Sequence, residues 1–141
     1  MFENIKQEIF SQFKEMQTVF FATCDNERPY VRPMLLLLYV NDKFLVATGT
    51  ENAKTPQLKI NPNFEFCYFI EKDSGHGYIR GTGRVEFIQD IQIRKHFIDK
   101  FSYIRHYWQE PEDPSYILLQ LHVDSFEYMR PGEQTSEKVQ L

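Results

Sequence analysis

Two short stretches of the chain combine residue types that packing alone does not require. Residues 32–37 place an arginine and a proline inside an apolar strand, and residues 48–54 place hydroxyl, amide and ammonium groups where a second strand leads into a short helix. The donors are Arg32, Thr48, Thr50 and Lys54, together with free backbone N–H groups of the loop. Such donors favour an anion. If the strands pair through a turn at 41–43, the donors meet at one end of a hairpin and predict a cradle for a phosphate.

The same strand can also serve a flat ring, because Met34 to Leu36 offer backbone amides and apolar surface beside the cradle. Simpler roles exist for these residues. Arg32 can pair with Glu27 or Glu51, and an exposed ion pair of that kind contributes little. The threonines can serve the strand and the turn, and Lys54 can be a solvated charge.

The remaining polar residues do not form a recognised catalytic pattern. The four histidines, His76, His96, His106 and His122, are not paired at metal-ligand spacing with another His, Cys or carboxylate. No Gly-x-Ser-x-Gly motif and no Cys–His arrangement indicates a nucleophile. The sequence therefore predicts no metal site, and its catalytic residues stay unassigned.

Alternating and helical patterns predict the elements that must position these residues. The expected order is a helix at 2–16, strands at 18–24, 30–40 and 44–48, a short helix at 54–60, strands at 64–71 and 78–89, a helix from Asp90 to Ile104 and a strand at 116–129. Pro33 places its strand at an edge or a bulge, because proline cannot donate to a sheet. Gly81 and Gly83 predict either a bend of the kind that closes a barrel or the close approach of another backbone.

This order suits a mainly β fold, a six-stranded antiparallel split barrel with flanking helices. The 141 residues form a single domain, 1–141, whose polar tail at 130–141 is expected to fray. A barrel this small is filled by its own side chains. Any sizeable ligand is therefore expected in an outer groove or between subunits.

Composition limits the partners. The net charge is −4 and no basic face is evident, which argues against nucleic acid. The longest unbroken apolar run, Met34 to Val40, is too short to span a membrane. The N-terminus lacks the layout of a signal peptide. These features predict a cytoplasmic protein with no membrane partner.

The motifs, taken in order, resemble the FMN-binding split-barrel superfamily, whose namesake is pyridoxamine 5′-phosphate oxidase. The resemblance covers about residues 18–88. It rests on Pro-Tyr-Val-Arg-Pro at 29–33, Thr-Gly-Thr at 48–50, Lys54 followed by Leu58, Asn-Pro at 61–62 and Gly-x-Gly-Arg-Val at 81–85. No single motif is specific, but the ordered set at these spacings is.

The resemblance implies that FMN is the cofactor and that Arg32 and Lys54 hold its phosphate. It places the backbone of 32–36 beside the isoalloxazine ring and Thr48 near the ring and ribityl chain. It also implies a homodimer, with the flavin site at the interface and a small-molecule substrate. The later strands and last helix of the second subunit then contribute Tyr78, Arg80 and Trp108. The expected cofactor-binding set is Arg32, Pro33, Met34, Leu35, Leu36, Thr48, Gly49, Thr50, Asn52, Lys54, Tyr78 and Trp108.

Two departures separate the chain from the namesake oxidase. Leu37 stands where that enzyme has a lysine for its substrate's phosphate, and the polar tail is unlike its substrate-binding C-terminal segment. The protein is therefore expected to be an FMN-dependent oxidoreductase other than pyridoxamine 5′-phosphate oxidase. The alternatives are a haem or deazaflavin protein on the same fold, a non-enzymatic flavin carrier, and a single-stranded nucleic-acid barrel with stacking aromatics.

Overall fold

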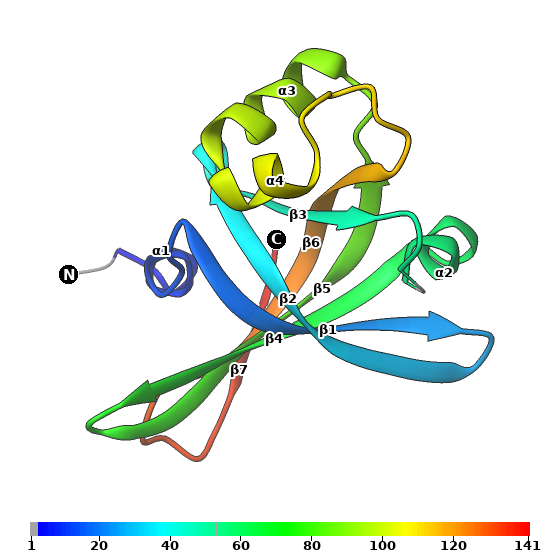
Figure 1. Cartoon of the computed structure of the whole chain (residues 1–141). Helices are drawn as coiled ribbons and strands as arrows, with labels where there is room; N and C mark the ends of the chain where they lie inside the picture. Colours follow the sequence, from blue (N-terminus) through cyan, green and yellow to red (C-terminus); the bar gives the residue numbers. More distant parts are fainter. Residues whose placement is uncertain (1–2, 53) are drawn as a thin grey trace.

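The computed structural model describes residues 3–52 and 54–141 and consists of a closed antiparallel barrel with helices around it (Figure 1). Phe2 and Ala53, which the sequence analysis included in a helix and a loop, lie outside the described residues. The strands are β1 (Met16–Asp25), β2 (Arg28–Tyr39), β3 (Lys43–Gly49), β4 (Asn63–Lys72), β5 (Gly75–Phe87), β6 (Tyr116–Met129) and β7 (Glu137–Gln140). The helices are α1 (Ile5–Ser11), α2 (Lys54–Ile60), α3 (Ile91–Lys100) and α4 (Ser102–Tyr107), with a 3-10 turn at Val40–Asp42.

Six strands close the barrel, as the sequence predicts. The sheet order is β3-β2-β1-β4-β5-β6-β7, and an additional pairing of β3 with β6 joins the ends of the six-stranded ring. The part of β2 that contains Pro33 is paired on one side only. Pro33 lies opposite Phe20 of β1, whereas β2 pairs with β3 only over Leu37 to Tyr39. The edge position predicted from this proline is confirmed.

The glycines of β5 lie where its pairing with β6 is irregular. The register between β5 and β6 shifts between Thr82 and Gly83. A Cβ built on Gly83 would lie 1.8 Å from the carbonyl oxygen of His122, and one on Gly81 would lie 2.6 Å from the ring of Phe66. Only glycine permits these approaches, so the close approach of another backbone, one of the two predicted alternatives, is confirmed at Gly83.

The first helix is shorter than the predicted 2–16. Asn4 caps α1 by accepting a hydrogen bond from the N–H of Gln7 at 2.9 Å, and the helix ends at Ser11. The chain then turns so that Phe13 packs edge-on against Phe44 of the barrel core, with ring centroids 5.0 Å apart. Met16 already belongs to β1. Packing of the aromatic side chain thus overrides the helical spacing.

The second predicted helix, from Asp90 to Ile104, is two helices. The carboxylate of Asp90 caps α3 as expected, at 2.9 Å from the N–H of Gln92. Phe101 then adopts an extended conformation, with φ −111° and ψ 112°. Its ring stacks on Phe97 at 5.8 Å, and Ile104 on α4 turns into the same core.

Two hydrophobic cores result. One fills the barrel and contains Phe21, Leu36, Phe44, Phe66 and Phe126. The other lies between the outer face of the barrel and helices α3 and α4, which Figure 1 shows at one end of the molecule. No helix within residues 3–52 and 54–141 is long and apolar enough to cross a membrane.

The C-terminal tail does not fray throughout, as the sequence analysis expected. Residues 137–140 form β7, which pairs antiparallel with β6 over Ser125 to Tyr128. The side chain of Val139 packs against the barrel core. Arg130 also binds Glu8 of α1, with Nε 2.8 Å from the carboxylate. The tail is ordered because the β7 strand and the side chain of Val139 join it to the barrel, and an ion pair joins it to α1.

Candidate cofactor-binding site

Arg32 is held at one end of the barrel by neutral partners. Alternation along β2 places its side chain on the same face as Met34 and Leu36. Its Nη1 donates to the hydroxyl of Thr23 at 2.9 Å, and its Nη2 is 3.5 Å from the amide oxygen of Gln57 on α2. Within the described residues Arg32 has no carboxylate within 4.0 Å, so the expected pairing with Glu27 or Glu51 does not occur. Its positive charge is therefore uncompensated by any carboxylate of the described residues.

Lys54 brings a second uncompensated charge to the same place. It begins α2 and is only 1% exposed. No ion pair of Lys54 forms within residues 3–52 and 54–141, and the alternative of a solvated surface charge is wrong. Burial, followed by repulsion from Arg32, lowers the pKa of Lys54 to about 8. An unpaired buried ammonium is costly, and an anion beside it would offset that cost.

Several backbone N–H groups of the loop after β3 are already engaged within the chain. The N–H of Thr50 donates to the carbonyl of Ser115 at 3.2 Å, and the N–H of Asn52 donates to Gly49 at 3.3 Å. The side chain of Asn52 accepts from the N–H of Lys54 at 3.3 Å. The free amides that the sequence predicted are therefore engaged at these positions. Arg32 and Lys54 are the cationic side chains that remain for an anion.

Residues 33–36 do not all face one ligand, because a strand alternates its side chains. Leu36 is fully buried in the barrel core, and its carbonyl accepts a hydrogen bond from Gln17 at 2.8 Å. Met34 packs against that core. Pro33 and Leu35 point to the opposite, outer face. The expected apolar surface for a ring is thus divided between two faces of β2.

Thr48 and Trp108 flank the loop. Thr48 is buried at the end of β3, opposite the start of β6. A Cβ built on Gly49 would lie 3.6 Å from Cζ2 of Trp108, so the indole covers this glycine within the same chain. Trp108 stacks on Tyr116 at 5.3 Å and donates from Nε1 to the hydroxyl of Ser115 at 3.1 Å. One chain alone therefore brings Trp108 to the loop.

Tyr78 and Arg80 lie on the outer face of β5, away from the partners of Arg32. The hydroxyl of Tyr78 donates to Glu127 at 2.6 Å. Arg80 pairs with Glu65 at 2.7 Å and with Glu127 at 3.2 Å, so its charge is already compensated. Neither residue contacts the Arg32–Lys54 pair within one chain.

Three residues of the site were not predicted from the sequence. Thr23 and Gln57 orient Arg32, and the Thr23 hydroxyl itself donates to Gln57 at 2.6 Å. The spacing of Lys54 and Gln57, three residues apart, is the one signal that places them on one face of a helix. Arg94 is the third. It is buried and donates to the carbonyls of Ile88, Pro111, Asp113 and Tyr116, which fixes the loop that carries Ser115.

The arrangement can bind an anion and shield an apolar group, but it does not hold an acid–base pair. Within the part of the chain that the structure describes, no three His, Cys, Asp or Glu residues cluster closely enough to hold a metal ion. None of the four histidines is a partner of Arg32 or Lys54. The donor set fits a phosphate-bearing cofactor.

Comparisons with known proteins agree with this class of fold. The profile of the family described as pyridoxamine 5′-phosphate oxidase matches residues 5–130. The chain belongs to this family. No curated protein sequence matches it.

Three solved structures illustrate the range of the fold. General Stress Protein 26 from Bacillus anthracis is 22% identical, with a TM-score of 0.75 over 97% of this chain and 98% of that one. A pyridoxamine 5′-phosphate oxidase-related FMN-binding protein from Nostoc punctiforme is 17% identical, with a TM-score of 0.65 over 88% of each chain. A heme-binding protein from Mycobacterium smegmatis is 10% identical, with a TM-score of 0.71 over 89% of this chain and 53% of that one.

Proposed function

We propose that this protein binds FMN and acts as a flavin-dependent oxidoreductase on a small molecule. The observation that carries the proposal is the pair formed by Arg32 and Lys54, two cations without a carboxylate partner among the described residues, one of them buried. A phosphate group would neutralise both. When bound, FMN would supply the hydride or electron chemistry.

The residues of this chain then bind and orient the cofactor. Arg32, held by Thr23 and Gln57, presents a guanidinium that can form two parallel hydrogen bonds to a phosphate. Lys54 adds a point charge from the start of α2. Thr48, buried at the end of β3, would add a hydroxyl donor, and Trp108 packs against Gly49 at the start of the loop.

The proposed assembly is a homodimer that completes the site across its interface. The outer face of β1, β2 and β4 carries an exposed apolar strip in which Phe20 is 51%, Val31 69% and Phe69 53% exposed. Pro33 lies opposite Phe20 in the register of β1 and β2. A contiguous apolar face of this kind indicates a protein interface. It also contains the outer residues of the strand that holds Arg32.

The cofactor assignment is tested by comparing FMN with riboflavin, which lacks the phosphate. Wild-type protein is titrated with both ligands and followed by flavin fluorescence and visible absorption. We expect FMN to bind at least about a hundredfold more tightly than riboflavin, because two charge-assisted contacts contribute about 1.5–3 kcal/mol each. The Arg32→Ala, Lys54→Ala double variant should remain folded and bind both flavins equally.

The matched control is Lys72→Ala, which removes an exposed lysine of β4 outside the site. It should leave both affinities unchanged. Equal binding of FMN and riboflavin by the wild type would refute the phosphate cradle. Turnover of a reduced nicotinamide by the holoprotein would distinguish an enzyme from a flavin carrier. A haem band in the freshly purified protein would keep the fold and replace the chemistry.

The interface is tested by Phe20→Glu, with Val40→Glu as a control at an exposed apolar residue outside the strip. Light scattering after size exclusion should give a dimer for the wild type and the control, and a monomer for Phe20→Glu. Loss of FMN affinity in the monomer would support a shared site. A monomeric wild type would refute the assembly.

A further inference from the structure

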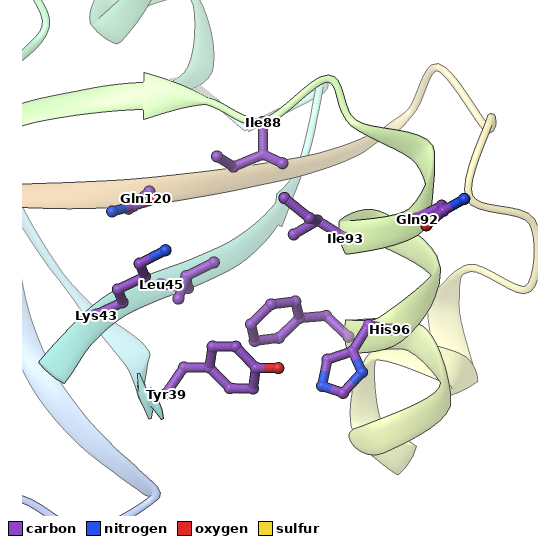
Figure 2. Close-up of a pocket in the computed structure, with 9 residues that line it drawn as sticks. Tyr39, Lys43, Leu45, Ile88, Gln92, Ile93, His96 and Gln120 are labelled. Carbon is purple, nitrogen blue, oxygen red and sulfur yellow. The ribbon is translucent and has the colours of Figure 1, made fainter. Parts of the chain in front are cut away.

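A second pocket lies between α3 and the outer face of the barrel (Figure 2). Its volume is about 280 Å³, at the lower end of the range for small-ligand sites. Strands β2, β3 and β6, the residue that follows β5 and helix α3 contribute its walls. The lining residues are Tyr39, Lys43, Leu45, Ile88, Gln92, Ile93, His96, Phe97 and Gln120.

This pocket is separate from the Arg32–Lys54 cradle. Lys43 begins β3, whereas Gly49, beside the cradle, ends it. Six residues of extended strand separate the two positions by about 20 Å. The pocket shares no lining residue with the proposed cofactor site. A ligand here would bind without displacing the flavin.

One side of the pocket is aromatic. The ring of Tyr39 is tilted against Phe97 at 4.9 Å and against His96 at 5.2 Å between centroids. His96 and Phe97 meet edge to face at 5.5 Å. Figure 2 shows the rings of Tyr39 and His96 side by side, with the aliphatic side chain of Ile93 above them. Three rings in mutually tilted orientations form a wall that a further flat ring can contact edge to face.

The charged side chain that lines the pocket is positive, with no negative counterpart among the lining residues. Lys43 is the one lysine or arginine among the nine lining residues, and none of the nine is an aspartate or glutamate. No ion pair of Lys43 forms within residues 3–52 and 54–141. Lys100 approaches the ring of Tyr39 at 5.8 Å, but its ammonium is paired with Glu15 at 3.0 Å. The amides of Gln92 and Gln120 add neutral donors at the rim.

We propose that this pocket binds a small carboxylate with one aromatic body, whose ring contacts Tyr39 and Phe97 and whose carboxylate pairs with Lys43. An apolar cavity with a single uncompensated cation at its mouth complements an anion at one end of an apolar molecule. A neutral ligand would leave Lys43 unused. A dianion would find only one cationic partner there.

The test uses 3-phenylpropanoate and its neutral amide, 3-phenylpropanamide, as matched probes. Each is titrated into the ¹⁵N-labelled full chain, with and without FMN, and amide chemical shifts are followed. We expect shifts centred on 43–45 and 92–97, and about fivefold tighter binding of the carboxylate, the effect of one solvent-exposed ion pair. Lys43→Met should remove the fivefold difference without altering amide affinity, while Lys72→Met should preserve it.

Ile93→Asp tests the apolar wall. Ile93 is 42% exposed on α3, so the protein should fold, and both probes should lose affinity because the new carboxylate lies beside the rings. Equal affinities of the two probes for the wild type would overturn the proposal. Shifts centred on 32 and 54–57 would also overturn it, because they would place the carboxylate in the phosphate cradle.

Discussion

Replacing Lys54 by methionine should stabilise the flavin-free protein at neutral pH. A pKa of about 8, against an ordinary value of 10.5, makes the protonated side chain about 3 kcal/mol less favourable in the folded chain than in the unfolded one. Lys54 is 1% exposed, so solvent screens little of this cost. Methionine has a similar length and no charge. We expect a gain of about 1–3 kcal/mol in the free energy of unfolding, since part of the gain is lost to imperfect packing.

The gain depends on pH with a defined sign. Because the pKa of Lys54 is lowered on folding, the unfolded chain binds more protons than the folded chain between about pH 8 and 10.5. The wild-type free energy of unfolding therefore rises across this interval. Below about pH 8 the cost of the buried charge is complete, and above 10.5 it is absent. The methionine variant lacks this contribution, so its advantage should shrink towards pH 10.5.

The assay is urea unfolding of flavin-free wild type, Lys54→Met and Lys72→Met at several pH values from 7 to 10.5, at one protein concentration. Only the difference between variants is interpreted, because other groups titrate in the same range. Parallel curves for the wild type and Lys54→Met would refute the reasoning, as would a less stable variant at pH 7. Added FMN should raise the stability of the wild type more than that of Lys54→Met.

Three further predictions follow from single contacts. Arg94→Met removes the guanidinium that donates to the carbonyls of Ile88, Pro111 and Tyr116, whereas the carbonyl of Asp113 still accepts from the N–H of Tyr116. The variant should therefore cost about 2–4 kcal/mol in urea unfolding and speed amide exchange at 111–116, and unchanged exchange would contradict the proposed role of Arg94. Gly83→Ala should lower the melting temperature sharply because its Cβ meets a backbone carbonyl at 1.8 Å, whereas Gly49→Ala, with 3.6 Å of clearance, should not. Glu8→Gln should be less stable than the wild type at pH 7, and the gap should close as the pH falls below about 4, because Arg130 lowers the pKa of Glu8 and that stabilisation is lost on protonation. Acid titration of both proteins checks this, and a gap that persists at low pH would contradict it.

Much of the fold follows from local patterns. Residues 54–60 form the predicted helix because Lys54 to Ile60 are bounded by a polar loop and Asn61-Pro62. The strand at 116–129 is also as predicted, since an apolar alternation runs through it. The two helix predictions that were wrong, at 2–16 and from Asp90 to Ile104, have a common cause. Phe13 and Phe101 fit a helical spacing, but each is drawn out of a helix by the aromatic core that it completes.

The two cationic residues of the candidate site could be predicted from the sequence, but the residues that orient them could not. Arg32 and Lys54 are unusual for their surroundings in the sequence, and the structure brings them together. Thr23 and Gln57 are ordinary residues whose role depends on a contact between β1 and α2, which no local pattern encodes. The engaged amide of Thr50 likewise depends on Ser115, far along the chain.

The way the barrel closes has a consequence for how the chain folds. β3 closes the ring by pairing with β6, and Glu8 near the start of the chain binds Arg130, 122 positions later. Contacts of such long range form slowly, because much of the chain must be ordered before they contribute. During synthesis, β1 to β5 emerge before the strand that completes the ring. We therefore expect the nascent chain to expose the edges of β3 and β5 until residues 116–129 have left the ribosome.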